Sequence, residues 1–510
     1  MTDEKIMPTL IDLWRGAHAA HESRSWPRRV VDGDLWRDLG CQLGDGLLTL
    51  AGLWGDAGVV HMALLDAMEG ELAIASLPCE GGKFPSIGAY HTPAIRLERA
   101  IQDLFGYEPV GAPDPRPWLD HGRWPVLAPL GARAPSHAKV EPYAFLPAEG
   151  EALHQIPVGP VHAGIIEPGH FRFNAGGETI VRLEERLGYT HKGVEALMAG
   201  ASLDRAARLA ARTSGDSTVA YSIAFSQAVE SALGVEVAVR AIWLRALMAE
   251  LERIANHLGD IGAICNDASF ALMHAHTGVL RERVLRACHA CFGHRLMMDV
   301  VAPGGTNADL TSSGAALIRE LIDNIRGAFP ALVELYDNTT SLQDRTVGTG
   351  FLRPELARQY GCGGFIGRAS GRSFDARRDF AYAPYDQLEF ETPVLHEGDV
   401  NARVWIRIRE IQQSLRLIDQ ILDRMPSGEI RTDVAGAGEP RERLALVESF
   451  RGDILVWVRL GPEGRVERCH LRDPSWFQWP LLEAAIEGNI VADFPICNKS
   501  FNCSYSGHDL

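Results

Sequence analysis

Apolar and polar positions follow two different periods along this chain. From Gly46 to Leu77, three short apolar runs (LLTLAGLW, VVHMALLD and ELAIASL) are separated by glycine and aspartate, which predicts an antiparallel meander. A helix is predicted from about Pro93 to Phe105. The first part of the chain is therefore expected to form a small sheet with a helix beside it.

Helices are predicted for most of the chain beyond about Ala201. Apolar residues recur every three or four positions from Val237 to Leu258, and again from Val400 to Met425, as expected for helices that bury one face. Pro426 and Gly428 end the second pattern. These long helices are predicted to form a bundle.

Short strands flank the predicted bundle. One is expected from Glu178 to Arg186, and DILVWVRL and RVERCHL, joined by GPEG, predict a hairpin near the C-terminus. The segment from Pro109 to Pro147 carries nine prolines, too many for regular structure, and is predicted to link two domains. We therefore predict an α+β protein. A small N-terminal α/β domain with an antiparallel sheet covers residues 1–145, and a large, mainly helical-bundle domain with flanking short β-sheets covers residues 146–510.

Composition narrows the classes of function. Apolar residues make up 46% of the 510 positions, yet no stretch approaches the roughly 18 apolar residues that cross a bilayer. The net charge of −16 argues against nucleic acid as a partner, because phosphate binding needs a basic surface. Nine cysteines, spread thinly, suit free thiols in a reducing compartment. The N-terminus shows no secretion signal, so a cytoplasmic protein is expected.

Two neighbouring segments carry candidate site residues. GPVHAGIIEPGHFRF contains His162, Glu167 and His170, and the glycines between them let a ligand approach the backbone. LEERLGYTHKGVEALMAG follows and contains Glu195. From the residues alone, the first segment also suits a turn-rich connection, and the second suits the start of an amphipathic helix with a charged face.

Further segments follow in an order that resembles one known family. DRTVGTG, GRASG, FDARRDFAYAPY and GDV-x-x-R come after the two segments above. Together they resemble the large subunits of group 4 nickel-iron hydrogenases, such as formate hydrogenlyase, and the 49 kDa subunit of respiratory complex I. The resemblance covers roughly Val158 to Leu510. LERAIQDLFGYEP in the N-terminal part resembles the complex I 30 kDa subunit, and fusion of these two subunits is typical of the hydrogenlyase type.

The resemblance implies a set of partners. The chain would be the large subunit of a membrane-associated oxidoreductase complex that couples electron transfer to ion translocation. Its expected partners are an iron-sulfur small subunit of the complex I 20 kDa type, a ferredoxin-like subunit, and antiporter-like and complex I-type membrane subunits. These would hold it peripherally on the inner face of the cell membrane. The iron-sulfur cluster would lie on the small subunit, and no cofactor is expected on this chain other than, in one alternative, a quinone.

The chain departs from the family at the nickel site. The nickel-iron hydrogenases that the chain resembles hold their metals with two C-x-x-C pairs, because soft thiolates suit nickel. Matched through the shared AVESALG, the first pair falls on Ser214 and Ser217, and matched through DFP, the second falls on Ser504 and Gly507. All four thiols are missing from these positions. A nickel-iron centre is therefore not expected.

The resemblance also places candidate residues around the position of the missing metal. The acids and bases expected to line this polar cleft are Glu167, His170, Asp216 and Glu195. In complex I, a histidine of the loop that contains His162 and His170 faces the quinone headgroup, so these two histidines are candidate quinone contacts. The complex I tyrosine that bonds quinone is matched by Gly215, which weakens the quinone hypothesis.

Two other patterns have both a structural and a chemical explanation. Glu250, Arg253 and His257 share one face of a predicted helix, where they could relay protons, although a solvated or interhelical salt bridge is the commoner arrangement. Cys288 and Cys291 form a C-x-x-C pair inside a helical run, which favours buried helix thiols over a metal site.

Four functions stay open at this point. The preferred one is a redox-complex subunit without nickel, whose pocket binds a quinone or another small acceptor. The alternatives are an active hydrogenase or formate hydrogenlyase subunit, which the missing thiolates oppose, a complex I-type quinone-reducing subunit, and a non-catalytic coupling scaffold. In the complex I alternative, NADH would be oxidised on another subunit, because no G-x-G-x-x-G follows a predicted strand here.

Overall fold

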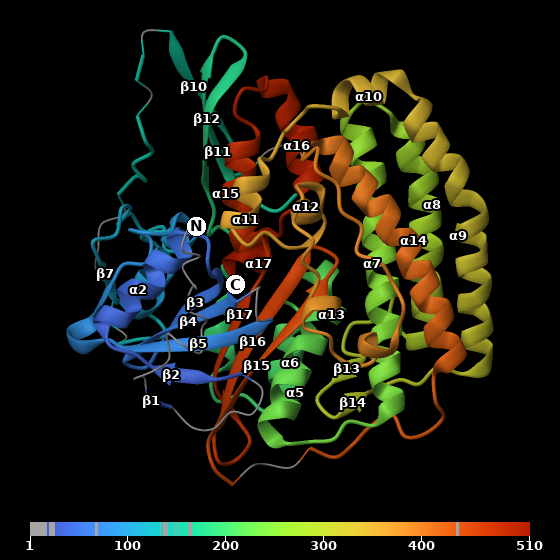
Figure 1. Cartoon of the computed structure of the whole chain (residues 1–510), viewed down its shortest axis with the longest axis horizontal. Helices are drawn as coiled ribbons and strands as arrows, with labels where there is room; N and C mark the ends of the chain where they lie inside the picture. The colour runs from blue at the N-terminus through green and yellow to red at the C-terminus, as the bar shows by residue number, and fades with distance from the viewer. Residues whose placement is uncertain are drawn as a thin grey trace, which may run out of the picture. The chain divides into compact units, whose positions relative to one another are not determined.

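The computed structural model describes residues 18–19, 26–66, 70–132, 134–135, 141–147, 149–150, 152–161, 166–434 and 438–510 (Figure 1). The chain divides into two compact units, Met1–Ala144 with Arg358–Gly361, and Phe145–Ala357 with Cys362–Leu510. His162, one of the two candidate quinone contacts, lies outside the described residues.

The first unit is built on a five-stranded sheet with the order β1-β2-β5-β4-β3. β2 and β5 are parallel, and the other neighbours are antiparallel. The predicted meander is confirmed as β3, β4 and β5, and most of its residues are buried. The described elements of this unit are β1 (His18–Ala19), β2 (Arg28–Val30), α2 (Gly33–Gly44), β3 (Thr49–Asp56), β4 (Val59–Asp66), β5 (Glu71–Pro78), β6 (Lys83–Pro85), α3 (Ile95–Phe105), β7 (Glu108–Val110), β8 (Val126–Leu127) and β9 (Ala134–Pro135).

The helix predicted at the end of this sheet is confirmed as α3, preceded by a 3-10 turn at Thr92–Ala94. The helix packs on β3, where a β-carbon at Gly55 would lie only 2.6 Å from the Phe105 ring. Glycine is therefore needed at this close approach. Gly106 ends α3 with a φ of 72°, a conformation that favours glycine.

Four long helices form the core of the second unit: α7 (Val239–Asp267), α8 (Ala271–Phe292), α9 (Ser312–Asn338) and α14 (Val400–Arg424). They lie alongside one another at the side of the unit (Figure 1). Both helices predicted from hydrophobic periodicity are confirmed, as α7 and α14. The predicted stripes are buried at, for example, Leu244 and Ile254 in α7 and Ile408 and Ile418 in α14.

Two three-stranded antiparallel sheets accompany the bundle. One contains β10 (Leu153–Val158), β11 (His170–Gly176) and β12 (Thr179–Arg186), and it confirms the strand predicted before Leu187. The other contains β15 (Arg441–Ser449), β16 (Gly452–Leu460) and β17 (Val466–Arg472), of which β16 and β17 are the predicted hairpin. α6 (Thr218–Leu233) packs on β15 and β16.

Short helices and a two-stranded sheet complete the second unit. They connect the bundle to the sheets, and three of them form the C-terminal end of the chain. The remaining described elements are α4 (Val194–Met198), α5 (Leu203–Ala210), β13 (Val301–Ala302), β14 (Gly305–Thr306), α10 (Thr340–Thr346), α11 (Pro354–Gln359), α12 (Gly364–Ala369), α13 (Ala376–Asp379), α15 (Ser475–Ala485), α16 (Phe494–Phe501) and α17 (Tyr505–Asp509).

The predicted α+β class is thus confirmed. Within the described part of the chain, no helix combines the length and the apolar character needed to cross a bilayer.

Candidate functional site

The C-terminal segment of the chain meets the loop before α6. Ser214 precedes a 3-10 turn at Gly215–Ser217, and its Oγ lies 2.8 Å from Ser504 Oγ, 290 positions along the chain. Both side chains are buried. Two of the four positions matched to the family's ligands are therefore in direct contact.

The position of Ser504 is set by the end of α16 and the start of α17. Asn502 ends α16 with a φ of 47°, which turns the chain toward α17. Ser504 then acts as the N-cap of α17, because its Oγ accepts a hydrogen bond from the Gly507 backbone N–H at 2.9 Å. The Ser504 N–H donates to Ser475 Oγ at 2.8 Å. This turn brings Ser504 and Gly507, the second matched pair, together.

Arg451, at the turn between β15 and β16, supplies the charge of the site. Its guanidinium donates to both carboxylate oxygens of Asp216, to Asn502 O at 2.6 Å and to Ser217 Oγ at 3.3 Å. The Arg451 side chain is 3% exposed, whereas that of Asp216 is 38% exposed. Burial alone would raise the pKa of Asp216, but Arg451 and the Ser214 hydroxyl hold it below its usual value. Sequence reasoning missed Arg451.

A second carboxylate, that of Asp473, belongs to the same cluster. Tyr221 is fully buried on α6 and donates from its hydroxyl to Asp473 Oδ2 at 2.7 Å. A β-carbon added to Gly507 would overlap this same oxygen. Burial and the neighbouring Asp473 charge raise the pKa of Tyr221 well above its usual value, so the phenol stays protonated. Gly507 therefore has no room for a side chain unless Asp473 moves.

The structure brings some of the predicted cleft residues to this cluster. Asp216 is part of it, as described, and Glu167 reaches the C-terminal segment, where its Oε2 accepts from the Ser506 N–H at 3.0 Å. Glu195 instead lies against β17, with Oε2 2.8 Å from Arg468 and Oε1 2.8 Å from His470 Nδ1. Burial alone would raise the pKa of Glu195, but Arg468 and His470 lower this pKa to about 2.

His170 begins β11 and is 8% exposed. Its Nδ1 lies 3.1 Å from Gly159 O, and its Nε2 accepts from Arg172 Nε at 3.3 Å. Burial lowers the pKa of His170, so the ring is neutral near pH 7. The Phe145 ring lies 5.0 Å from it. His170 contacts Gly159, Arg172 and Phe145, none of which belongs to the serine cluster.

The structure also locates the two sequence patterns that had both a structural and a chemical explanation. Glu250, Arg253 and His257 are buried on α7 and pair with other helices, so they form an interhelical network rather than a solvated face. Cys288 and Cys291 both lie in α8, as the helical pattern predicts, with Cys288 buried and Cys291 partly exposed.

Comparisons with known proteins decide the family. Residues 268–443 match the family described as the respiratory-chain NADH dehydrogenase 49 kDa subunit. The chain is 31% identical to formate hydrogenlyase subunit 5 of Escherichia coli (strain K12), over 84% of this chain and 77% of that protein. It is 30% identical to one of the NADH-quinone oxidoreductase subunits of Syntrophobacter fumaroxidans, over 69% of this chain and 95% of that protein.

The chain belongs to the large-subunit family shared by membrane-bound hydrogenases and complex I. This large subunit also resembles a chain in the structure of a membrane-bound sulfane sulfur reductase, an archaeal respiratory membrane complex. The TM-score is 0.67 with 26% identity, over 71% of this chain and 99% of that one. The motif order in the sequence thus correctly predicts the large subunit of a membrane-associated oxidoreductase complex.

The groups at the family's nickel positions make a poor nickel site. Ser214 and Ser504 offer neutral hydroxyls that bond to each other, and Gly507 offers no side chain. Arg451 places a guanidinium against Ser217, where it would repel a metal cation. Within the described residues, no group of three or more His, Cys, Asp or Glu side chains is arranged to hold a metal ion.

Proposed function

We propose that this large subunit takes part in electron transfer without a nickel-iron centre of its own, in a complex that couples the transfer to ion translocation. The observation that carries the proposal is the Arg451 guanidinium, bonded to Asp216 and Ser217 where the matched ligand positions meet. The guanidinium is a fixed cation, and its pairing with the Asp216 carboxylate offsets the charge of both groups. The proposal therefore requires no metal at these positions.

The relatives support the idea that proteins of this fold catalyse different reactions. Their names cover formate hydrogenlyase, NADH-quinone oxidoreductase and sulfane sulfur reductase, so this fold serves different reactions. Function therefore depends on the residues of the site and not on the fold alone. Under the proposal, electrons pass through an iron-sulfur small subunit of the complex I 20 kDa type, with a ferredoxin-like subunit beside it. Antiporter-like and complex I-type membrane subunits hold the assembly on the inner face of the cell membrane.

The partner set can be tested directly. The full chain would be tagged, purified from gently solubilised membranes, and its companions identified by mass spectrometry. The proposal expects an iron-sulfur subunit and membrane subunits in constant ratio to the chain. A chain that separates from the membrane fraction alone, at every detergent and salt condition, would contradict the proposal.

Quinone binding at His170 is the second candidate function. The observation that favours it is a neutral, buried imidazole whose Nε2 accepts a hydrogen bond from Arg172. This nitrogen could instead accept a hydrogen bond from the hydroxyl group of a quinol. Binding of a quinone analogue would be measured in the purified complex, for wild type and for His170→Ala. This function expects weaker binding in the variant. If neither protein binds any quinone, the candidate is rejected and a non-quinone acceptor or a coupling scaffold takes its place.

A further inference from the structure

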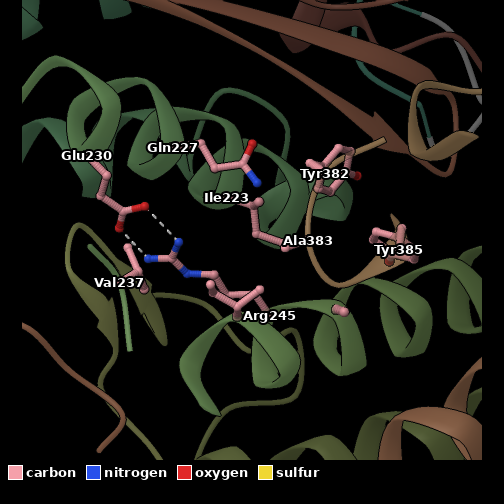
Figure 2. Close-up of a pocket in the computed structure, with 10 residues that line it drawn as sticks. Ile223, Gln227, Glu230, Val237, Arg245, Tyr382, Ala383 and Tyr385 are labelled. Carbon is pink, nitrogen blue, oxygen red and sulfur yellow. Dashed lines mark hydrogen bonds and ion pairs between the residues drawn. The ribbon is translucent and has the colours of Figure 1, made fainter. Parts of the chain in front are cut away.

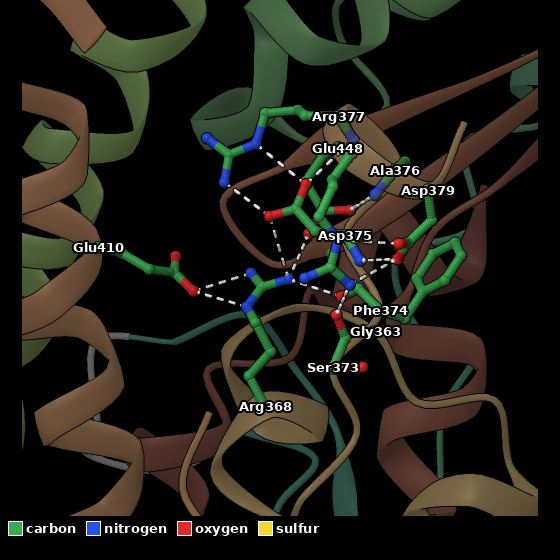
Figure 3. A network of polar contacts seen from close by, with 12 residues as sticks. Gly363, Arg368, Ser373, Phe374, Asp375, Ala376, Arg377, Asp379, Glu410 and Glu448 are labelled. Atoms are coloured by element: carbon green, nitrogen blue, oxygen red, sulfur yellow. Dashed lines mark hydrogen bonds and ion pairs between the residues drawn. The ribbon is translucent and has the colours of Figure 1, made fainter. Parts of the chain in front are cut away.

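A second cluster of charges lies deep in the helical unit, centred on Arg368 of α12. Its Nε donates to Glu410 Oε1 at 2.8 Å, and its Nη1 donates to Glu448 Oε1 at 2.9 Å. Nη1 also lies 3.6 Å from Asp375 Oδ2. Figure 3 shows this guanidinium between Glu410 on α14 and the carboxylates of Asp375 and Glu448. All four side chains are at most 1% exposed.

The cluster continues to α7 through two more guanidiniums. Arg377 donates to Asp375 Oδ2 at 2.7 Å and to Glu250 Oε1 at 3.0 Å, and Arg253 donates to Glu250 Oε2 at 3.3 Å. His257 Nε2 lies 2.7 Å from Glu410 Oε2. No member is more than 3% exposed. The members, which we call the Arg368 network, are Glu250, Arg253, His257, Arg368, Asp375, Arg377, Glu410 and Glu448.

The charges of the Arg368 network do not balance. It holds four carboxylates and three guanidiniums, so with a neutral imidazole and every carboxylate ionised it carries one excess negative charge. An unbalanced charge in a dry interior is costly, and proteins relieve such a charge by binding a proton. The groups joined by these ion pairs therefore lack one positive charge among themselves, which one bound proton would supply.

The geometry decides which group takes this proton. His257 Nδ1 is buried and has no hydrogen-bond partner within the described residues, so an imidazolium would bury an unsatisfied N–H. Burial accordingly lowers the pKa of His257. Glu410 is bonded by both Arg368 and His257, and Asp375 by both nitrogens of the Arg377 fork. These carboxylates are well compensated and stay ionised.

Glu448 is the least compensated of the four carboxylates. Its oxygens accept from Arg368 Nη1 and from the Ala376 N–H at 3.0 Å. The charged or titratable groups that face it are Arg253 from α7, Arg368 from α12, Arg372 before α13, Asp375 and Arg377 at α13, Tyr382 after α13, and Asp453 from β16. Burial and the Asp375 charge raise the pKa of Glu448 to about 7.

A pocket beside the network supplies a route for water. The cavity has a volume of about 130 Å³ and is lined by α6, α7 and the segment that carries Tyr382, Ala383 and Tyr385 (Figure 2). Tyr385 donates from its hydroxyl to Glu250 Oε1 at 2.7 Å, and the Tyr382 hydroxyl accepts from the Glu448 N–H at 3.3 Å. The volume suffices for several waters. The pocket thus borders the Arg368 network, with Tyr385 bonded to the Glu250 carboxylate and Tyr382 to the backbone of Glu448.

We propose that Glu448 is a proton-binding site, which takes from bulk water the one proton that the Arg368 network lacks and returns it through the Tyr382–Tyr385 pocket. In this step, a hydronium ion loses its proton to the Glu448 carboxylate, and the products are a neutral carboxyl group and water. The site belongs to the chain itself and does not depend on whether the complex carries nickel.

Infrared spectroscopy of the full chain tests the site. The C=O stretch of a protonated carboxyl group would be recorded between pH 5 and pH 9 in wild type and in Glu448→Gln. The wild-type spectrum should contain one carboxyl band that the spectrum of Glu448→Gln lacks. This band should disappear from the wild-type spectrum as the pH rises through about 7. Glu98→Gln is the matched control, because Glu98 is also buried with a pKa raised to about 7 but lies in the other unit. This control should keep the Glu448 band.

The proposal is overturned if Glu448→Gln retains every carboxyl band, or if the lost band does not change with pH. A second variant tests the route and keeps Glu448 intact. Ala383→Trp should fill the pocket and slow the deuterium shift of the band after transfer to D₂O, whereas Ala381→Trp, outside the lining, should leave the rate unchanged. Equal exchange rates in wild type and Ala383→Trp would exclude this pocket as the route.

Discussion

Gly507 leaves no room for a side chain at one of the positions matched to the family's ligands. Any β-carbon there overlaps Asp473 Oδ2, which in turn accepts from Tyr221. We expect Gly507→Ala to lower the free energy of unfolding by about 1–3 kcal/mol, the usual cost of forcing atoms into a packed site. Urea denaturation measures the change.

Gly215→Ala provides the matched comparison for this substitution. No atom lies within 4 Å of a β-carbon built at Gly215, although this residue belongs to the same cluster of loops. We expect the two variants to differ clearly, with Gly215→Ala close to wild type. If Gly507→Ala is as stable as Gly215→Ala, the cluster is less tightly packed than described.

Glu98 gives a pH prediction in the first unit. It is buried and accepts from Ser86 Oγ at 2.7 Å and from the Ile87 N–H at 2.5 Å. Burial raises its pKa from 4.5 to about 7. The folded state therefore binds the proton more tightly than the unfolded state, and Glu98 makes stability fall as the pH rises from about 5 to about 7.

Replacing Glu98 by Gln should flatten this part of the stability profile. The wild-type free energy of unfolding should drop more steeply between pH 5 and pH 7 than that of Glu98→Gln, by at most about 3 kcal/mol over the interval. Denaturant titrations at a series of pH values measure both slopes. Parallel profiles would mean that Glu98 does not titrate in this range.

The site residues were only partly predictable. Ser214 and Ser504 follow from shared motifs, because the two C-x-x-C pairs of the family bind one centre and so must meet. Arg451 was missed, because it lies 235 positions from Asp216 in an ordinary turn and carries no local pattern. The structure places Glu195 against Arg468 and His470 of β17, a pairing that the sequence does not reveal because these residues are far apart along the chain.

At the scale of elements, α12 connects α14 to β15 through Arg368. Arg368→Met should cost about 3–5 kcal/mol of stability, because it leaves Glu410 and Glu448 buried without their shared cation. Thermal or urea unfolding of the full chain measures the loss.

An exposed arginine serves as the control for this loss. Arg326 on α9 is 47% exposed and pairs with Asp419 at 2.6 Å. Arg326→Met should change stability by about 0–1 kcal/mol, the usual value of a surface pair. Equal effects of the two substitutions would show that the Arg368 network does not hold these elements together.

The elements themselves were predictable where their pattern was long. α7 and α14 each repeat an apolar stripe over several turns, and period alone identifies them. β15 was missed because its apolar core, Leu444 to Val447, is short and buried on both faces. Such a run cannot be told from a helix segment by its periodicity. Buried Glu448 at its end further obscures the pattern.

At the scale of the whole molecule, the order of the motifs predicted the family. The chain shares its family with relatives named as a formate hydrogenlyase and a quinone oxidoreductase, and in this chain Ser214, Ser504, Asp216 and Arg451 form a cluster of hydrogen bonds.

The central claim is an electron-transfer large subunit without a nickel-iron centre. The most direct measurement is the nickel content of the complex, purified from cells grown with ample nickel and quantified by mass spectrometry per copy of this chain. The account predicts iron from the partner subunits and nickel far below one atom per chain. One nickel atom per chain, retained after removal of loosely bound metal, would contradict it.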